Sequence, residues 1–198
     1  MVATPKRKSR SSAAKKRSTP TPTSTLGHRR LIKVLRQRGW VVKSASDSRK
    51  LLPAAVAKRY QSIPAGVEEF LSSLQVCVSP HESAWFLTAD DYARKRGSGF
   101  RWNEIELMMI EGAEGDRALA AEYRSFWDDH FPVMLAVHSD YDYLAVRISD
   151  GAVVHGYAPE WESSKVARSF AALLSALATE ADTQCDRRPW SLFVGKGC

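Results

Sequence analysis

Two pairs of carboxylates have a spacing that could support chemistry. Asp140 and Asp142 are two residues apart, and so are Glu160 and Glu162. Residues at i and i+2 of an extended chain point to the same side, so each pair can act on one ligand. Such pairs serve in general acid–base catalysis or as ligands of a weakly bound divalent cation.

Two histidines, His138 and His155, lie near these carboxylates, and an imidazole beside a carboxylate is a common acid–base pair. However, the five histidines of the chain have no spacing typical of a metal site. The motifs of serine hydrolases, zinc proteases, phosphate-binding loops and dinucleotide-binding folds are absent from the sequence. We therefore interpret the carboxylates as turn residues on a solvated acidic edge, and we expect no catalytic residue, no metal ion and no cofactor.

Aromatic residues gather in the same part of the chain. Seven of them fall within 36 residues: Phe126, Trp127, Phe131, Tyr141, Tyr143, Tyr157 and Trp161. Tyr141, Tyr143 and Trp161 occupy expected turns or strand ends, where we expect exposure. Exposed Tyr and Trp beside acidic groups are typical of a surface that binds a protein, above all a basic one. The candidate partner-binding residues are Asp140, Tyr141, Asp142, Tyr143, Glu160, Trp161 and Glu162.

An antiparallel meander of three strands is predicted to position these residues. Residues 131–137, 143–148 and 152–157 are apolar and separated by turns, and Asp150-Gly151 is a strong hairpin signal. Because side chains alternate along a strand, Tyr143 should face away from the buried side. The buried side is expected to consist of Val133, Leu135, Val137, Leu144, Val146 and Ile148.

Helices and shorter strands are predicted around this meander. Apolar spacing indicates helices over about 47–60 and 164–178, and a short basic amphipathic helix that ends at Gly39. Helix starts are expected where a side chain can cap the first turn, at Ser62, Thr88, Asn103 and Asp116. Glu106 is expected to bond back to the helix start at Asn103. Short strands are expected at 40–42, 76–78 and 85–87, with a last one at 191–194.

Charge divides the chain into unequal parts. The net charge is +7, yet residues 1–25 hold seven basic residues and no acid, residues 26–59 sum to +9, and residues 60–198 sum to −9. Thirteen of the first 25 residues are Ser, Thr or Pro and none is aromatic, which predicts a disordered basic tail. Such a tail can serve as a phosphate-binding arm or as a nuclear-import signal. We favour the alternative that it is a solvated end, or residues upstream of the true start, without a role of its own. We expect this tail, a basic helical segment at 26–60, and one domain at 61–198.

Cysteines and apolar runs indicate the cellular compartment. Cys77, Cys185 and Cys198 are odd in number and form no CxxC pair, which favours the reducing cytosol over a disulfide framework. No apolar run approaches the roughly 18 residues of a membrane span. No apolar segment follows the first basic residues, so we expect no secretory signal.

Several short motifs follow one another in an order that is similar to a known family. They are WFLT, DDY, FRWNE-x-E, FWDDHFPV, DYDYLAV, DG-x-VVHGYAPEWE and VA-x-SF, and they extend over roughly residues 52–178. This order resembles the SUKH superfamily of Smi/Knr-type domains, with which the Syd protein is grouped. The resemblance implies an α+β fold with helices packed on a mainly antiparallel sheet, and no catalysis. It implies scaffold or rim roles for Trp85, Phe100, Trp102, Trp127, Gly151, Glu160, Trp161 and Phe170.

Bacterial members of this superfamily are mostly immunity proteins that bind and block a cognate toxin, often a nuclease. Our leading hypothesis is therefore a cytoplasmic domain that neutralises a basic toxin by binding it. The alternative is a regulatory or nucleic-acid-associated protein that contacts phosphates only through residues 1–59. An enzyme is a third class, to be recognised by an effect of substituting His138 or His155 that partner binding does not explain.

Overall fold

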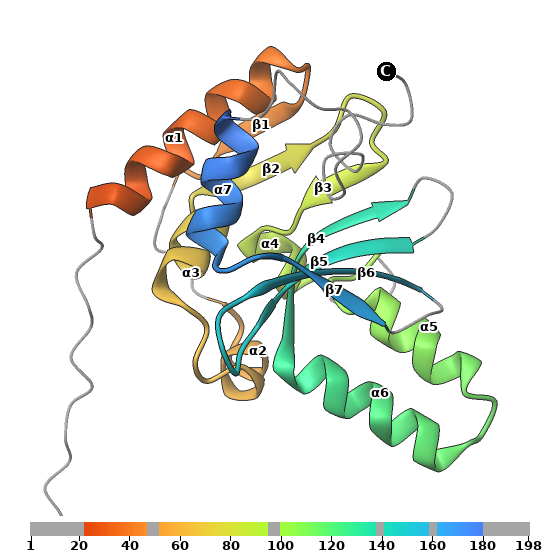
Figure 1. Ribbon diagram of the computed structural model, residues 1–198. Helices are drawn as coiled ribbons and strands as arrows, with labels where there is room; N and C mark the ends of the chain where they lie inside the picture. Colours follow the sequence, from red (N-terminus) through yellow and green to blue (C-terminus); the bar gives the residue numbers. More distant parts are fainter. Residues whose placement is uncertain (1–21, 47–51, 95–99, 138–140, 159–161, 180–198) are drawn as a thin grey trace, which may run out of the picture.

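The computed structural model describes residues 22–46, 52–94, 100–137, 141–158 and 162–179 (Figure 1). Within these ranges the fold is α+β, with one seven-stranded antiparallel sheet whose strands follow each other in chain order. The strands are β1 (Val41–Ser44), β2 (Leu74–Val78), β3 (Ala84–Phe86), β4 (His130–Val137), β5 (Tyr141–Arg147), β6 (Val153–Ala158) and β7 (Ser163–Ala167). The helices are α1 (Pro22–Gln37), α2 (Ala54–Arg59), α3 (Ala65–Ser72), α4 (Ala89–Ala93), α5 (Glu104–Gly112), α6 (Arg117–Asp129) and α7 (Phe170–Thr179).

The predicted meander is confirmed as strands β4, β5 and β6. The turn between β5 and β6 contains Gly151 at a φ of +73°, a left-handed conformation that glycine adopts without strain. Beside it the Arg147 guanidinium donates two hydrogen bonds to Asp150, of 3.0 and 2.6 Å. Local turn chemistry therefore determines this hairpin, as the sequence indicated.

The predicted facing of β4 and β5 is wrong. Leu135 pairs with Tyr143 and Met134 pairs with Leu144, so Leu135 and Leu144 lie on opposite faces. The register shifts between Pro132 and Met134, and helices cover both faces of the sheet. With both faces buried, alternation of apolar residues does not reveal which pairs share a face.

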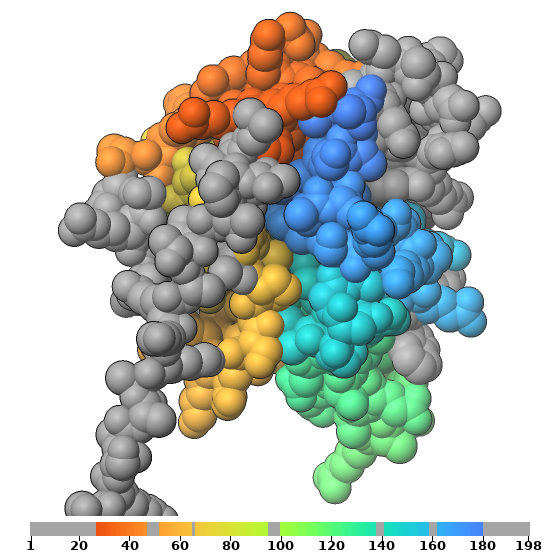
Figure 2. All heavy atoms as spheres, turned by 60° about the vertical axis from the view of Figure 1, so that its left-hand side comes forward, coloured from red at the N-terminus to blue at the C-terminus, as the bar shows by residue number. Residues whose placement is uncertain are grey.

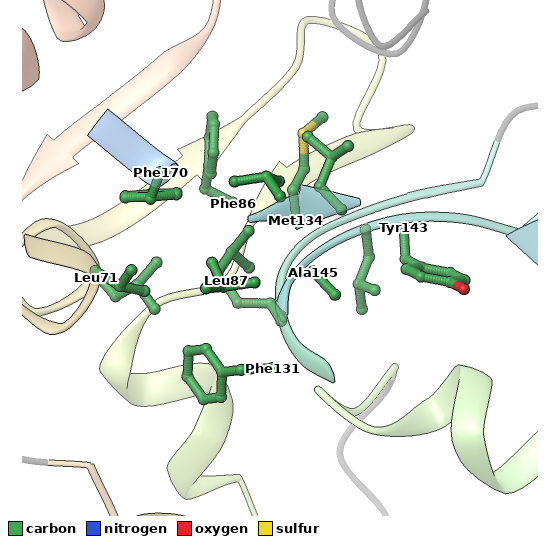
Figure 3. Packing of buried hydrophobic residues seen from close by; sticks show 14 of the residues in the cluster. Leu71, Phe86, Leu87, Phe131, Met134, Tyr143, Ala145 and Phe170 are labelled. Atoms are coloured by element: carbon green, nitrogen blue, oxygen red, sulfur yellow. The ribbon is translucent and has the colours of Figure 1, made fainter. Parts of the chain in front are cut away.

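Two layers of aromatic side chains show how the helices cover the sheet. On one face Phe86 of β3 contacts Phe70 of α3, with ring centroids 5.3 Å apart, and Phe70 contacts Phe170 of α7 at 5.5 Å. On the other face Tyr143 contacts Trp127 of α6 at 4.8 Å. In Figure 3 Tyr143 accordingly points away from Phe86 and Phe170. Buried side chains therefore pack against both faces of the central strands.

The C-terminal helix is shorter than predicted. Residues 163–167 form β7, which pairs with β6, and the helix begins only at Phe170. The apolar residues Val166 and Phe170 are four apart, a spacing that fits a helix as well as a strand followed by a helix. Residues 163–167 form a strand because they pair with β6.

Two of the expected caps are confirmed. The Asp116 carboxylate accepts hydrogen bonds from the backbone of Ala118 and Leu119 at 2.9 and 3.1 Å, which starts α6. Thr88 and Asp91 form a reciprocal capping box at the start of α4. Each satisfies backbone N–H groups that have no partner inside the helix.

Two other expected caps are wrong. Pro64 precedes α3, with no side-chain cap, so Ser62 does not start this helix. Asn103 precedes α5 but its side chain makes no capping hydrogen bond. Glu106 does not reach back to this helix start, because it binds Arg59 through two hydrogen bonds of 2.7 Å. A tertiary ion pair thus replaces the expected local contact.

The basic N-terminal helix is an integral part of the fold. Leu31 and Leu35 are buried, α1 packs against α7, and β1 pairs with β2 at the edge of the sheet. The helix begins at Pro22, inside the region predicted to be a disordered tail, and residues 1–21 lie outside the described ranges. The helix predicted over 47–60 is described only as α2, because residues 47–51 are also outside these ranges. The strand predicted at 191–194 lies outside as well.

Candidate protein-binding surface

Four strand ends meet at one end of the sheet. Val137 pairs with Tyr141, Tyr141 pairs with Ala158, and Ser163 pairs with Gly156 two residues away. We call this the hairpin end, with Tyr141, Asp142, Tyr157 and Glu162 as its described aromatic and acidic residues. Asp140, Glu160, Trp161 and His138 lie outside the described residues. Three of the seven predicted binding residues, Tyr141, Asp142 and Glu162, are therefore brought to one end of the sheet.

Two large hydrophobic side chains are exposed at the hairpin end. Tyr141 is 42% exposed and Tyr157 is 36% exposed. They lie on opposite faces of the sheet, because Tyr157 pairs with Asp142, the neighbour of Tyr141. The third exposed large hydrophobic residue in the described part of the chain is Val41 on β1, at the far edge of the sheet. Exposure of tyrosine is thus concentrated where the sequence predicted a binding surface.

Tyr141 belongs to a row of aromatic rings. Its ring stacks on Phe100 with an interplanar angle of 19° and a centroid distance of 6.0 Å, and Phe100 contacts Trp85 edge-on at 5.5 Å. Phe100 and Trp85 are half-buried. The family resemblance implied scaffold or rim roles for these two residues. The spacing in sequence between residues 85, 100 and 141 carries no signal of their contact. The ring of Tyr141 is therefore packed against Phe100 although its side chain is exposed.

Asp142 is not a free carboxylate. Its Oδ1 atom lies 2.8 Å from Nε2 of His155 on the neighbouring strand, and His155 is 4% exposed. A histidine beside a carboxylate can exchange a proton with a substrate only where the imidazole is accessible. We interpret the contact as a cross-strand hydrogen bond that stabilises the hairpin end. On this face Tyr157 is the exposed side chain, and Asp142 is half-buried.

The prediction that Tyr143 is exposed is wrong. Its side chain is 0% exposed, and its hydroxyl has no hydrogen-bond partner among the described residues. Burial raises the pKa of this phenol. Tyr141 and Tyr143 share a face of β5, but α6 covers the face at Tyr143 and does not cover Tyr141. The alternation of side chains along β5 was predicted from the sequence. The position of α6 above Tyr143 was not.

Acidic charge is concentrated on the pair of helices α5 and α6. Residues 103–129 contain eight acidic and two basic residues, a net charge of −6. Glu111, Glu114 and Glu122 are exposed. The first of these helices begins four residues after Phe100 in the chain. The carboxylates predicted from the sequence to form an acidic surface lie at strand ends and not on these helices, although the composition of residues 103–129 carries the signal.

Some of these carboxylates form ion pairs or hydrogen bonds with other parts of the protein. Arg59 of α2 binds Glu106 and also donates to Asp128 at 2.8 Å, and the hydrogen bonds to both carboxylates raise the pKa of its guanidinium against the opposing effect of burial. The Asp129 carboxylate accepts hydrogen bonds from the backbone and hydroxyl of Ser149, at 2.8 and 2.7 Å. The exposed glutamates of α5 and α6, in contrast, form no ion pair with a described residue.

The described ranges contain neither a metal-binding cluster nor a membrane-spanning helix. No group of three or more His, Cys, Asp or Glu side chains there is arranged to hold a metal ion. No helix in the same ranges is long and apolar enough to cross a membrane. Cys77 is buried in β2, and burial raises the pKa of its thiol to about 12.

Comparisons with protein families, with curated proteins and with solved structures give no match for this chain.

Proposed function

We propose that this chain is a non-catalytic protein-binding domain whose partner contacts the hairpin end. The observation that carries the proposal is Tyr141, a tyrosine exposed to solvent yet stacked on Phe100, which in turn packs edge-on against Trp85. Tyrosine is enriched among residues that dominate binding energy, because it offers a large rigid surface with few rotatable bonds. A ring that is already held loses little further freedom on binding.

The proposed partner is a basic protein. The exposed glutamates of α5 and α6 follow Phe100 in the chain, and residues 60–198 as a whole sum to −9. Opposite charge accelerates encounter and excludes partners of the same sign. A nuclease needs a basic groove for its own substrate, which an acidic surface can occupy.

The proposed biological role is that of an immunity protein that neutralises a toxin in the cytoplasm. It rests on the resemblance of residues 52–178 to the SUKH superfamily, with which the α+β architecture agrees. In such a role no residue of the chain carries out chemistry. Neutralisation follows from covering the toxin's active site or the surface through which it reaches its target.

A capture experiment with three baits tests the proposal. The full-length chain, its Tyr141→Ser variant and its Val41→Ser variant are tagged and used to isolate partners from the cells that produce the protein. Val41 is the matched control, since it is an exposed apolar side chain at the other edge of the sheet. We expect one basic protein on the wild-type and Val41→Ser baits that is depleted on Tyr141→Ser. Equal recovery on all three baits would contradict a binding role for Tyr141.

A further inference from the structure

The edge of the molecule opposite α5 and α6 carries a concentrated positive charge. Residues 22–46, which form α1 and β1, contain six basic residues and no acidic one. The two ends lie far apart in the fold, with α1 at one end and the pair α5 and α6 at the other in both Figure 1 and Figure 2. The proposed protein partner is assigned to the hairpin end and to the exposed glutamates of α5 and α6, which leaves the basic end without a role.

The basic side chains of α1 are arranged on the side that faces away from the core. Leu31 and Leu35 point inward and are buried, and His28 packs edge-on against Phe70 at 5.1 Å. Arg29, Lys33 and Arg36 follow each other at intervals of four and three residues, which places them on one stripe of a helix. At 1.5 Å per residue this stripe is about 10 Å long.

A groove runs beside this basic stripe. It has a volume of about 540 Å³ and is lined by Arg29, Ile32, Lys33, Arg36, Gln37 and Ser44. All three residues of the stripe therefore contribute to one concave surface between α1 and the end of β1. None of the described residues that line this groove is a carboxylate.

The charges of the stripe are not neutralised within the described part of the fold. Arg36 donates from Nε and Nη2 to the backbone oxygen of Val42, at 3.3 and 3.0 Å, an acceptor without net charge. Arg29 and Lys33 are exposed and form no ion pair with any described residue. The groove therefore has three positively charged side chains without a carboxylate partner among the described residues. A ligand with several negative charges would bind such a surface most strongly.

The sequence that leads into α1 adds charge of the same sign. Thirteen basic residues precede Asp47, the first acidic residue of the chain. Seven of them lie in residues 1–25, so the chain enters α1 from a strongly basic segment. A single phosphate or a short acidic peptide would engage only a few of these charges, whereas a nucleic-acid strand presents a charge every 3.4 Å.

We propose that α1 and the end of β1 bind the phosphate backbone of a nucleic-acid duplex, with Arg29, Lys33 and Arg36 as the contacting residues. Binding depends on charge and not on base sequence, since the stripe offers phosphate contacts without an element placed to read base edges. The surface is separate from the hairpin end, so a protein partner and a duplex can be bound at the same time. This inference stands independently of the proposed immunity role.

Salt dependence of duplex binding tests the proposal. The probe is a fluorescein-labelled 24-base-pair DNA of arbitrary sequence, titrated with the full chain at several salt concentrations. Each phosphate contact contributes about −0.9 to the slope of log K against log salt. The double variant Arg29→Gln/Lys33→Gln removes two contacts and should make the slope shallower by about 1.8. Arg36 is left in place because it also holds the backbone of β1.

Arg117→Gln/Arg124→Gln is the matched control. It removes the same charge from exposed arginines of α6, seven residues apart, at the acidic end of the molecule, and should leave the slope unchanged. Vesicles with 30% phosphatidylserine are titrated in parallel. The proposal is overturned if the chain does not bind the duplex at low salt, if it binds the vesicles but not the duplex, or if both double variants have the wild-type slope. Unchanged melting temperatures show that the variants are folded.

Discussion

Substitution of Gly156 by alanine should destabilise the protein although alanine is ordinarily the better residue in a strand. Gly156 lies opposite Tyr143 in the pairing of β5 and β6. A Cβ atom added at Gly156 would overlap the hydroxyl and Cζ of Tyr143, and would lie 2.8 Å from its Cε1. Because Tyr143 is fully buried against Trp127, its ring cannot swing away.

The loss of unfolding free energy in Gly156→Ala can be estimated from the packing around the Tyr143 ring. Forcing an additional methyl group into a filled core costs about 1–3 kcal/mol. We expect about 2 kcal/mol for Gly156→Ala, and for a chain of this size each kcal/mol lowers the melting temperature by about 2–4 °C. The expected decrease is therefore about 4–8 °C.

Thermal and urea unfolding, followed by far-ultraviolet circular dichroism, measure this effect. Gly66→Ala in α3 is the control, since a Cβ there meets no atom within 4 Å and should stabilise the helix by about 0.5 kcal/mol. The two glycine substitutions should thus have opposite signs. In a Tyr143→Ala background, Gly156→Ala should become neutral, because the ring is gone. A Gly156→Ala protein that unfolds at or above the wild-type temperature would refute the reasoning.

Two further predictions concern buried polar groups. Tyr143→Phe removes a hydroxyl without a described partner and should raise the free energy of unfolding by about 1 kcal/mol, measured by urea titration. Burial lowers the pKa of both His28 and His130, so near pH 6.5 the unfolded chain binds protons that the folded chain does not. The free energy of unfolding should therefore decrease as the pH falls from 7 to 5, and less so in a His28→Gln/His130→Gln variant.

Each of these two predictions has a result that would contradict it. A loss of stability in Tyr143→Phe would mean that the hydroxyl is hydrogen-bonded. Stability that is constant or rises between pH 7 and pH 5 would contradict burial of the two imidazoles. The lowered pKa values of Glu104 and Asp150, each held by a neighbouring arginine, act on stability below this window.

The elements that the sequence predicted correctly are those with a local cause. The hairpin at Gly151 depends on one turn, and the start of α6 depends on the Asp116 side chain and two nearby N–H groups. The inward stripe of α1 follows from the spacing of Leu31 and Leu35. Each is decided by residues within a few positions of one another, which is the range that sequence patterns report.

The elements that were missed depend on packing that a sequence pattern does not report. The facing of β4 and β5 depends on the register shift between Pro132 and Met134, and the start of α7 depends on the pairing of β7 with β6. The ion pair of Glu106 with Arg59 joins residues that lie 47 positions apart in the chain. The candidate surface shows the same division. Tyr141 was predicted at a strand end and is exposed, whereas the burial of Tyr143 and the support from Phe100 depend on how α6 and the start of α5 pack on the sheet.

The affinity for the captured partner is the measurement that tests the central claim most directly. Isothermal titration calorimetry at 100 mM salt would compare the wild-type chain with Tyr141→Ala and Val41→Ala. Loss of a tyrosine that anchors an interface costs about 2 kcal/mol or more, which is roughly a thirtyfold rise in Kd. We predict a rise of this size for Tyr141→Ala and an unchanged Kd for Val41→Ala. Equal Kd values for all three proteins would contradict the assignment of the hairpin end as the binding surface.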